Sequence, residues 1–406
     1  MISRLFAAIV LISSLFLWFS CASSRRFGSM VLSSEDIALE DNIWFSSEDA
    51  RLVHTMTFRP AEFPSLEPSV GLGVITTDRR DPAVTLSESE RAALSESFRT
   101  AYIDSLLREV PLAGVLGGDF VHGWPAGNPS AWAQNWRTSA LFDNSWGIPS
   151  LILAIRRFRA EPETGEGRVF IVQGDLLDQY GRSAGVNNAN GSAGYGSPRG
   201  YEFLYDGKLA QRFDLGLITV DGEGQGAFFP EDPPSLALSP PADVGVFIDA
   251  PGPDHRAAFI TAWEMALDRG VQTMIPDGPG QYLSFSLDSW AFPGAQALTG
   301  LYFQSFNERR VLLVLPDSPL LPPYPRFIAS SFLVALLSAA RHPLSGAEDL
   351  EPLEMNFRGG DALSRALMRG LALYGIPLSD PVPVPCDEGG PWREVQRFSR
   401  GWIEKM

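Results

Sequence analysis

The chain has little cysteine, lysine and histidine, which limits the kinds of metal site and catalytic site that it can form. Its 406 residues include 2 cysteines, Cys21 and Cys386, two lysines, Lys208 and Lys405, and 4 histidines. The cysteines stand far apart and no His-x-x-x-His pair occurs, so the spacings typical of a zinc site are missing. A Gly-x-Ser-x-Gly nucleophile elbow is missing as well. We therefore expect no metal and no cofactor.

Positive charge is also in short supply. Lysine and arginine number 32 against 48 acidic residues, which gives a net charge of −16. Nucleic-acid binding draws on a basic face that neutralises phosphates, so we expect no nucleic-acid partner. Hydrophobic residues make up 45% of the chain, which is enough to bury a substantial core.

No apolar run near the N-terminus reaches the roughly twenty residues that span a bilayer. The run from Leu5 to Phe19 follows Arg4 and precedes small residues from Ser20 to Ser24. This order of a basic residue, an apolar segment and small residues is typical of a signal peptide. The sequence predicts an exported protein with a signal peptide over residues 1–20.

The residues Leu17-Trp18-Phe19-Ser20-Cys21 resemble a relaxed bacterial lipoprotein signal of the spirochaete type. Ser20 and Cys21 match the pattern, whereas Trp18 stands where leucine is usual and Leu17 lies one residue early. The resemblance implies that Cys21 carries a lipid that anchors the protein to a membrane of the cell envelope, in the periplasm or facing the surface. Cleavage after Ala22, without a lipid, is the competing route.

Composition divides the rest of the chain into parts. Residues 21–40 are polar and small and predict a tether. Pro-rich stretches at 230–234 and 239–241 predict a boundary between domains. We expect an α+β protein, with a β-rich domain over 41–240 that has long Gly-rich loops, an α/β domain over 243–378 and a C-terminal tail over 379–406.

Periodicity predicts the individual elements. Strands are expected at 54–58, 70–76, 150–155, 169–172, 215–220, 244–248, 271–275, 282–287, 298–306 and 311–315. Helices are expected at 87–106, 254–269, 327–340 and 361–374. The middle of the chain, from Gly114 to Gly226, is expected to consist of strands and large loops.

The most distinctive stretch begins at Tyr195-Gly196-Ser197-Pro198 and continues through Gln211-Arg212-Phe213 to Asp221. It resembles the LGFP-type repeat of bacterial envelope and secreted proteins, and a weaker copy starts at Trp146-Gly147-Ile148-Pro149, so the two span residues 146–221. The resemblance implies a small β-meander in a non-catalytic envelope module that contacts cell-wall polymer. An ordinary Gly-rich hairpin is the alternative reading.

Few residues suggest a site. Asp119 and His122 lie three apart and are the candidate catalytic pair, and a capping Asp119 beside a packed His122 is the alternative. Aromatic rings that can stack on sugars are the binding candidates, although such residues more often pack in a core. These are Trp132, Trp136, Tyr195 and Tyr201.

These observations favour an exported envelope lipoprotein with a non-enzymatic binding or structural role. Its expected partners are the membrane, through the lipid on Cys21, and cell-wall polymer or another envelope protein. One alternative is an envelope hydrolase acting on glycans or esters. Another is a component of an export or outer-membrane assembly complex, which would expose a large apolar patch.

Overall fold

The computed structural model describes residues 47–61, 88, 121–122, 132–136, 151–155, 169–187, 195–196, 198–230, 259, 262–263, 266, 276–278, 280–287, 298–306, 311–316, 325–357, 360–384 and 392–405. The signal peptide, the tether, Cys21, Asp119 and Cys386 lie outside the described residues. The predicted strands at 70–76, 244–248 and 271–275 do too, as does the predicted helix at 87–106 apart from Glu88, which is helical.

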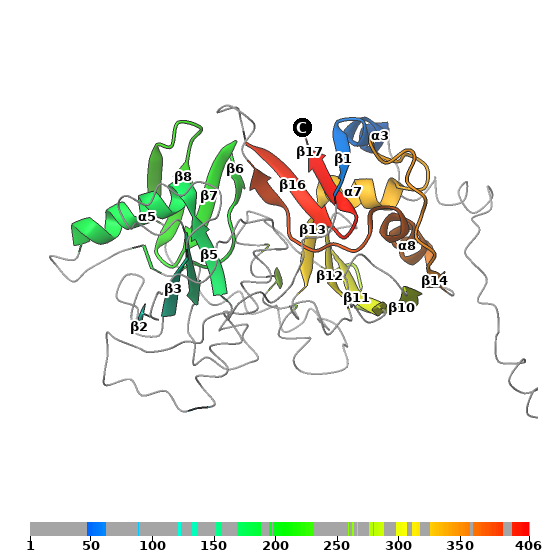
Figure 1. Ribbon diagram of the computed structural model, residues 1–406, viewed down its shortest axis with the longest axis horizontal. Coiled ribbons are helices and arrows are strands. Elements are labelled where there is room, and N and C mark those ends of the chain that lie inside the picture. The colour runs from blue at the N-terminus through cyan, green and yellow to red at the C-terminus, as the bar shows by residue number, and fades with distance from the viewer. Residues whose placement is uncertain are drawn as a thin grey trace, which may run out of the picture.

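Two antiparallel sheets come from the first half of the chain, coloured cyan to green in Figure 1. Four strands form the first sheet, in chain order: β2 (Val121–His122), β3 (Trp132–Trp136), β4 (Leu151–Ile155) and β5 (Val169–Gln173). Four more form the second: β6 (Phe203–Tyr205), β7 (Lys208–Phe213), β8 (Gly216–Val220) and β9 (Gly226–Pro230). Helix α5 (Gly174–Asn187) follows β5, and its Leu176 and Tyr180 pack with Phe213 and Ile218 in one core.

Two further antiparallel sheets come mainly from the second half. One has the order β13 (Arg326–Ala329), β12 (Val311–Pro316), β11 (Leu298–Phe306), β10 (Gln281–Leu287) and β14 (Asn356–Phe357). The other has the order β1 (Met56–Pro60), β17 (Gly401–Lys405), β16 (Arg393–Phe398) and β15 (Val382–Val384). An N-terminal strand therefore forms the edge of a sheet whose other strands are C-terminal.

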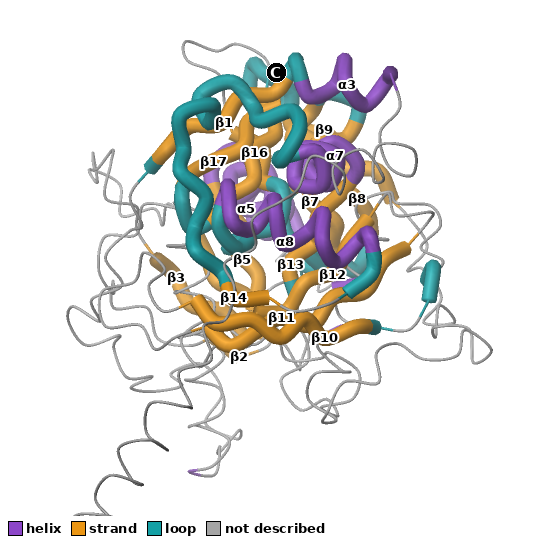
Figure 2. Tube along the Cα trace, turned by 90° about the vertical axis from the view of Figure 1, so that its right-hand side faces the viewer, coloured by secondary structure: helices purple, strands orange, loops and turns teal. Residues whose placement is uncertain are grey.

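Helices fill the space between these last two sheets. In both views α7 (Ser330–Ser338) and α8 (Ala362–Tyr374) lie between β11 and β12 on one side and β16 and β17 on the other (Figures 1 and 2). The short helix α3 (Ser47–Val53) precedes β1. One apolar core joins all these layers, because Phe58, Phe303, Leu336, Leu367 and Phe398 belong to the same buried cluster.

Many of the predicted elements are confirmed. Strands were expected where β4, β5, β8, β10, β11 and β12 lie. Helix α8 begins and ends as its caps predict: the Asp361 carboxylate accepts a hydrogen bond from the Ser364 N–H at 2.8 Å, and Gly375 takes φ 84° at the end. Phe259 and Trp263, expected on one helical face, are helical and buried. The content of helices and antiparallel sheets agrees with an α+β protein.

Other predictions need correction. The expected helix at 327–340 is wrong in its first part, because residues 326–329 form β13 and pair with Val311–Val314 of β12, so that the helix starts only at Ser330. Helix α5 was not predicted, since its run of Gly, Ser and Asn resembles a loop. Residues within the expected C-terminal tail form β15, β16 and β17. The domain division near residue 240 stays a prediction.

Candidate binding site

The small β-meander predicted from the Tyr195–Asp221 stretch is present as β6, β7 and β8, with β9 added at its edge. Gly207 makes the first turn at φ 71°. The buried amide of Gln211 holds the meander to its neighbours, since Nε2 donates to the carbonyl oxygens of Ile171 at 2.7 Å and Gly200 at 2.9 Å. Pro198 forms an isolated bridge with Phe213. A single glutamine thus ties the meander to β5.

The same arrangement occurs a second time, at Tyr374-Gly375-Ile376-Pro377 and Gln396-Arg397-Phe398. The amide Nε2 of Gln396 donates to the carbonyl oxygens of Phe327 at 3.1 Å and Ser379 at 2.9 Å. Pro377 bridges to Phe398 as Pro198 does to Phe213. Gly196 and Gly375 share positive φ values of 83° and 84°. The two meanders therefore share these contacts of the glutamine, the proline and the glycine.

The edge strands of the two meanders also correspond. Ile218 of β8 faces Phe228 of β9, and Ile403 of β17 faces Phe58 of β1. The Phe228 ring stacks on Tyr195 at a centroid distance of 4.2 Å, and the Phe58 ring lies 5.1 Å from Tyr374. The N-terminal strand β1 thus occupies in the second meander the place that β9 occupies in the first.

The sheets that precede the meanders match as well. Trp132 of β3 faces Ile155 of β4, and Tyr302 of β11 faces Leu315 of β12, at the same distance in register from the strand ends. We call β2–β5, α5 and β6–β9 the first unit. The second unit consists of β10–β13, α7, α8 and β15–β17, completed by β1. Trp392 joins the two, because it packs against the apolar core of the first unit.

The sequence carries a signal for this repeat that comparison of residues 146–173 with 194–221 missed. Both units contain Tyr-Gly-x-Pro followed by Gln-Arg-Phe-x-x-Gly-x-Ile. The spacing from tyrosine to glutamine differs, since it runs from 195 to 211 in one unit and from 374 to 396 in the other. The extra residues of the second copy hide the match from a search for a fixed period.

The predicted site residues are distributed over the first unit. His122 of β2 and Trp132 of β3 are partners in register, and Trp136 lies on the same strand as Trp132. Tyr201 is only 2% exposed and its ring meets Phe170 edge-on at 5.4 Å. Tyr195 is half-buried and stacks on Phe228. Asp119 lies outside the described residues, so its pairing with His122 stays a prediction.

A pair of tyrosines in the second unit, one exposed and one half-buried, was missed from the sequence. Tyr282 of β10 and Tyr302 of β11 are partners in register, with ring centroids 4.6 Å apart, and Tyr282 is 44% exposed. The Tyr282 hydroxyl donates to the Thr299 carbonyl at 3.3 Å, which fixes the direction of the ring. By register this pair occupies the position of His122 and Trp132 in the first unit. Both units therefore carry a cross-strand aromatic pair at one place.

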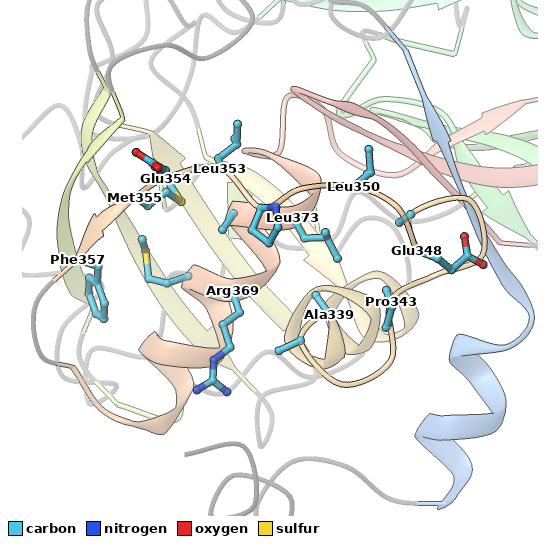
Figure 3. Close-up of a pocket in the computed structure, with 15 residues that line it drawn as sticks. Ala339, Pro343, Glu348, Leu350, Leu353, Glu354, Met355, Phe357, Arg369 and Leu373 are labelled. Carbon is cyan, nitrogen blue, oxygen red and sulfur yellow. The ribbon is translucent and has the colours of Figure 1, made fainter. Parts of the chain in front are cut away.

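A cavity of about 400 Å³ lies beside α8 in the second unit. Figure 3 shows its walls, which come from the end of α7, the segment 343–357 and α8. Most of the lining is apolar, and its charged members are Glu348, Glu354 and Arg369. The Arg369 side chain is 8% exposed.

Buried ionisable groups frame this region. Burial raises the pKa of the Tyr374 hydroxyl, which accepts a hydrogen bond from the Leu344 N–H at 3.0 Å. Burial lowers the pKa of Arg400, whose Nη1 donates to the carbonyl oxygens of Glu351, Ala372 and Leu373 at 2.9 to 3.2 Å. Arg400 therefore fastens the segment before β14 to the end of α8.

Within the described ranges, no group of three or more His, Cys, Asp or Glu residues could hold a metal ion. In that same part of the chain, no helix has both the length and the apolar character needed to cross a membrane. No protein-family model matches the chain, and no curated protein matches it.

Proposed function

We propose that this protein is an envelope lipoprotein, exported and anchored through Cys21, that binds a glycan polymer of the envelope without catalysis. The observation that carries the proposal is the contact of the exposed Tyr282 with the half-buried Tyr302, whose positions correspond by register to His122 and Trp132. The proposal includes a two-domain α+β organisation, with an α/β C-terminal domain, and an LGFP-like character of the first meander.

Stacked aromatic rings suit a sugar polymer for a physical reason. The face of a sugar ring presents C–H groups, which pack on the apolar face of an aromatic ring, while hydroxyl groups at the rim keep their hydrogen bonds. The Tyr282 ring is half-exposed and held in place by the Tyr302 ring and by its own hydroxyl contact. A ring fixed in advance loses little conformational freedom on binding.

Binding residues at the matching positions of two units on one chain would act together on a polymer. Binding of one unit raises the effective concentration of the polymer at the other, so retention would exceed what either unit achieves alone. This reading favours polymer over a short soluble sugar. It also supports a scaffold role, in which the lipid on Cys21 holds one end and the polymer the other.

Retention of the mature protein on purified peptidoglycan and on envelope glycans tests the proposal. We expect retention above a control protein of similar acidity, and loss of much of it in Tyr282→Ala. Tyr205→Ala is the matched control, because Tyr205 is 49% exposed at the turn of another sheet. No retention of the wild type, or equal retention of both variants, would remove the basis of the proposal.

Labelling with a radioactive fatty acid tests the anchor separately. Label should enter the wild-type protein in cells and not Cys21→Ala. Label in neither protein would show that export ends with cleavage after Ala22.

A further inference from the structure

Besides the longer spacing from tyrosine to glutamine in the second unit, the two units differ between the strand that ends the first sheet and the Tyr-Gly-x-Pro turn. In the first unit, residues 174–194 fill this interval and include α5. In the second, residues 330–373 fill it and include α7 and α8. The first unit forms its meander without the extra segment. The extra segment of the second unit adds α7 and α8, which contribute Leu336 and Leu367 to the buried core, and it also lines a cavity.

The cavity of about 400 Å³ is built largely from this extra segment. Several lining residues have small side chains that leave space: Ala339, Ala340, Ala347 and Ala372. The remaining walls include Leu350, Leu353 and Met368. A volume of this size with an apolar lining is typical of sites for small ligands.

The charges of the lining are separated. In Figure 3 the guanidinium of Arg369 lies on the opposite side of the lining from the carboxylate of Glu354, and Glu348 lies at a third corner. Arg369 projects from α8 and is nearly buried. A buried guanidinium attracts an anion strongly and can bind a carboxylate through two parallel hydrogen bonds.

The frame around the cavity is held by specific contacts. Arg400 Nη1 binds the carbonyl oxygens of Ala372 and Leu373 on α8, and also that of Glu351. The Leu353 N–H donates to the Ala372 carbonyl at 2.7 Å. The residue of the first unit that corresponds to Arg400 is Leu215, which is exposed and has no side-chain donor for such hydrogen bonds. These hydrogen bonds of Arg400 therefore occur only in the unit that contains the cavity, among the two corresponding positions.

We propose that this cavity binds a single hydrocarbon chain that ends in an anionic group, with the chain against the alanine and leucine walls and the anion at Arg369. The apolar lining favours a hydrocarbon tail, and the positive charge of Arg369 favours an anionic head group. Glu348 and Glu354, away from Arg369, disfavour a second anion. A fatty acid and a single-chain phospholipid share this chemistry.

Titration of the full mature protein with a fluorescent long-chain fatty acid tests the proposal. We expect saturable binding, at least tenfold weaker for the fatty alcohol of the same length. Ala340→Leu, which enlarges an exposed residue of the lining, should weaken binding about tenfold, whereas Ala227→Leu on the exposed face of β9 should not. Competition by a lysophospholipid distinguishes a membrane lipid from a free fatty acid as the source of the chain.

Arg369→Met keeps the length of the side chain and removes its charge. We expect it to abolish the preference for acid over alcohol while leaving alcohol binding unchanged. The thermal transition of each variant shows whether it folds, and the acid-over-alcohol preference of the wild type tests the head-group claim independently. Absence of saturable binding, or equal affinity in Ala340→Leu, would overturn the proposal. Tyr282→Ala should bind the fatty acid as the wild type does. Loss of glycan binding and loss of fatty-acid binding can therefore be told apart.

Discussion

The ring of Phe58, near the start of the described chain, lies 5.1 Å from the ring of Tyr374, close to its end. The contact reproduces that of Phe228 with Tyr195 in the first unit. In the second unit β1 pairs with β17 at the edge of the sheet, the place that β9 takes beside β8 in the first unit. The N-terminal strand β1 is thereby joined to the C-terminal sheet.

Removal of the Phe58 ring should destabilise the protein strongly. Phe58 is fully buried in the largest core, and Phe→Ala changes in such sites cost about 3–5 kcal/mol. We expect Phe58→Ala to lower the free energy of unfolding by that amount in urea titration of the mature chain. Phe229→Ala, at an exposed position of β9, should change it by less than about 0.5 kcal/mol. Equal effects would contradict the role of β1 as an integral strand.

The two bridging glutamines should be energetically equivalent. Each donates from one amide nitrogen to two buried carbonyl oxygens. Gln396→Leu or Gln211→Leu leaves those carbonyls without this donor, at a cost of about 1–3 kcal/mol. Gln225→Leu is the control, because Gln225 is exposed. A loss in one variant only, by chemical denaturation, would argue against the correspondence of the units.

Much of the architecture could be predicted from local patterns, and the pairing between distant segments could not. Patterns of only a few residues predict the caps of α8 and the apolar strands β11 and β12. Strands β16 and β17 do not, since they contain Gln396, Arg397 and Glu404, which are buried only because of their partners in the fold. No pattern in the sequence near Met56–Pro60 predicts that this strand pairs with Gly401–Lys405.

The site shows the same limit. The choice of aromatic residues as binding candidates stays a prediction, and the sequence around a ring does not reveal its exposure. Tyr201 and Tyr282 have similar local sequences of polar and apolar residues, yet Tyr201 is buried against Phe170 and Tyr282 is half-exposed. Tyr201 lies just before β6, where its ring meets Phe170, whereas Tyr282 lies within β10. The cavity beside α8 depends on segments that meet only after folding.

Because Tyr374 is buried, the stability of the protein should fall at high pH. Because burial raises its pKa above the value near 10 of an exposed tyrosine, the unfolded chain loses the proton first. Its contribution to stability is therefore complete below pH 10 and is lost as pH rises from there toward the folded pKa, by about 1.4 kcal/mol per pH unit. Burial, with a smaller effect of Asp214, raises the pKa of Tyr180 in the same direction.

The comparison of urea unfolding at several pH values above 9 measures this effect. Tyr374→Phe should lose stability at neutral pH, because the Leu344 N–H then lacks its acceptor, and should show a flatter decline above pH 10. Tyr205→Phe, at an exposed tyrosine, should keep the wild-type slope. An unchanged slope in Tyr374→Phe would contradict the assignment.

Gly375 should not tolerate a side chain. Its φ of 84° is unfavourable for other residues, and a Cβ there would collide with Ser399 Oγ. We expect Gly375→Ala to lower the thermal transition by several degrees, corresponding to more than about 1 kcal/mol. Gly222→Ala, where a Cβ meets nothing within 4 Å, is the matched control. Comparable transitions for the two variants would show that the turn tolerates a side chain.

The central claim is that both units bind one envelope polymer, and the affinity of four proteins for purified peptidoglycan tests it most directly. The four are the wild type, Tyr282→Ala, Trp132→Ala and the double variant. We predict that each single change weakens retention several-fold and that the double change reduces it to the level of a control protein, because the polymer then has no aromatic pair in either unit. Retention of the double variant equal to that of the wild type would contradict the claim.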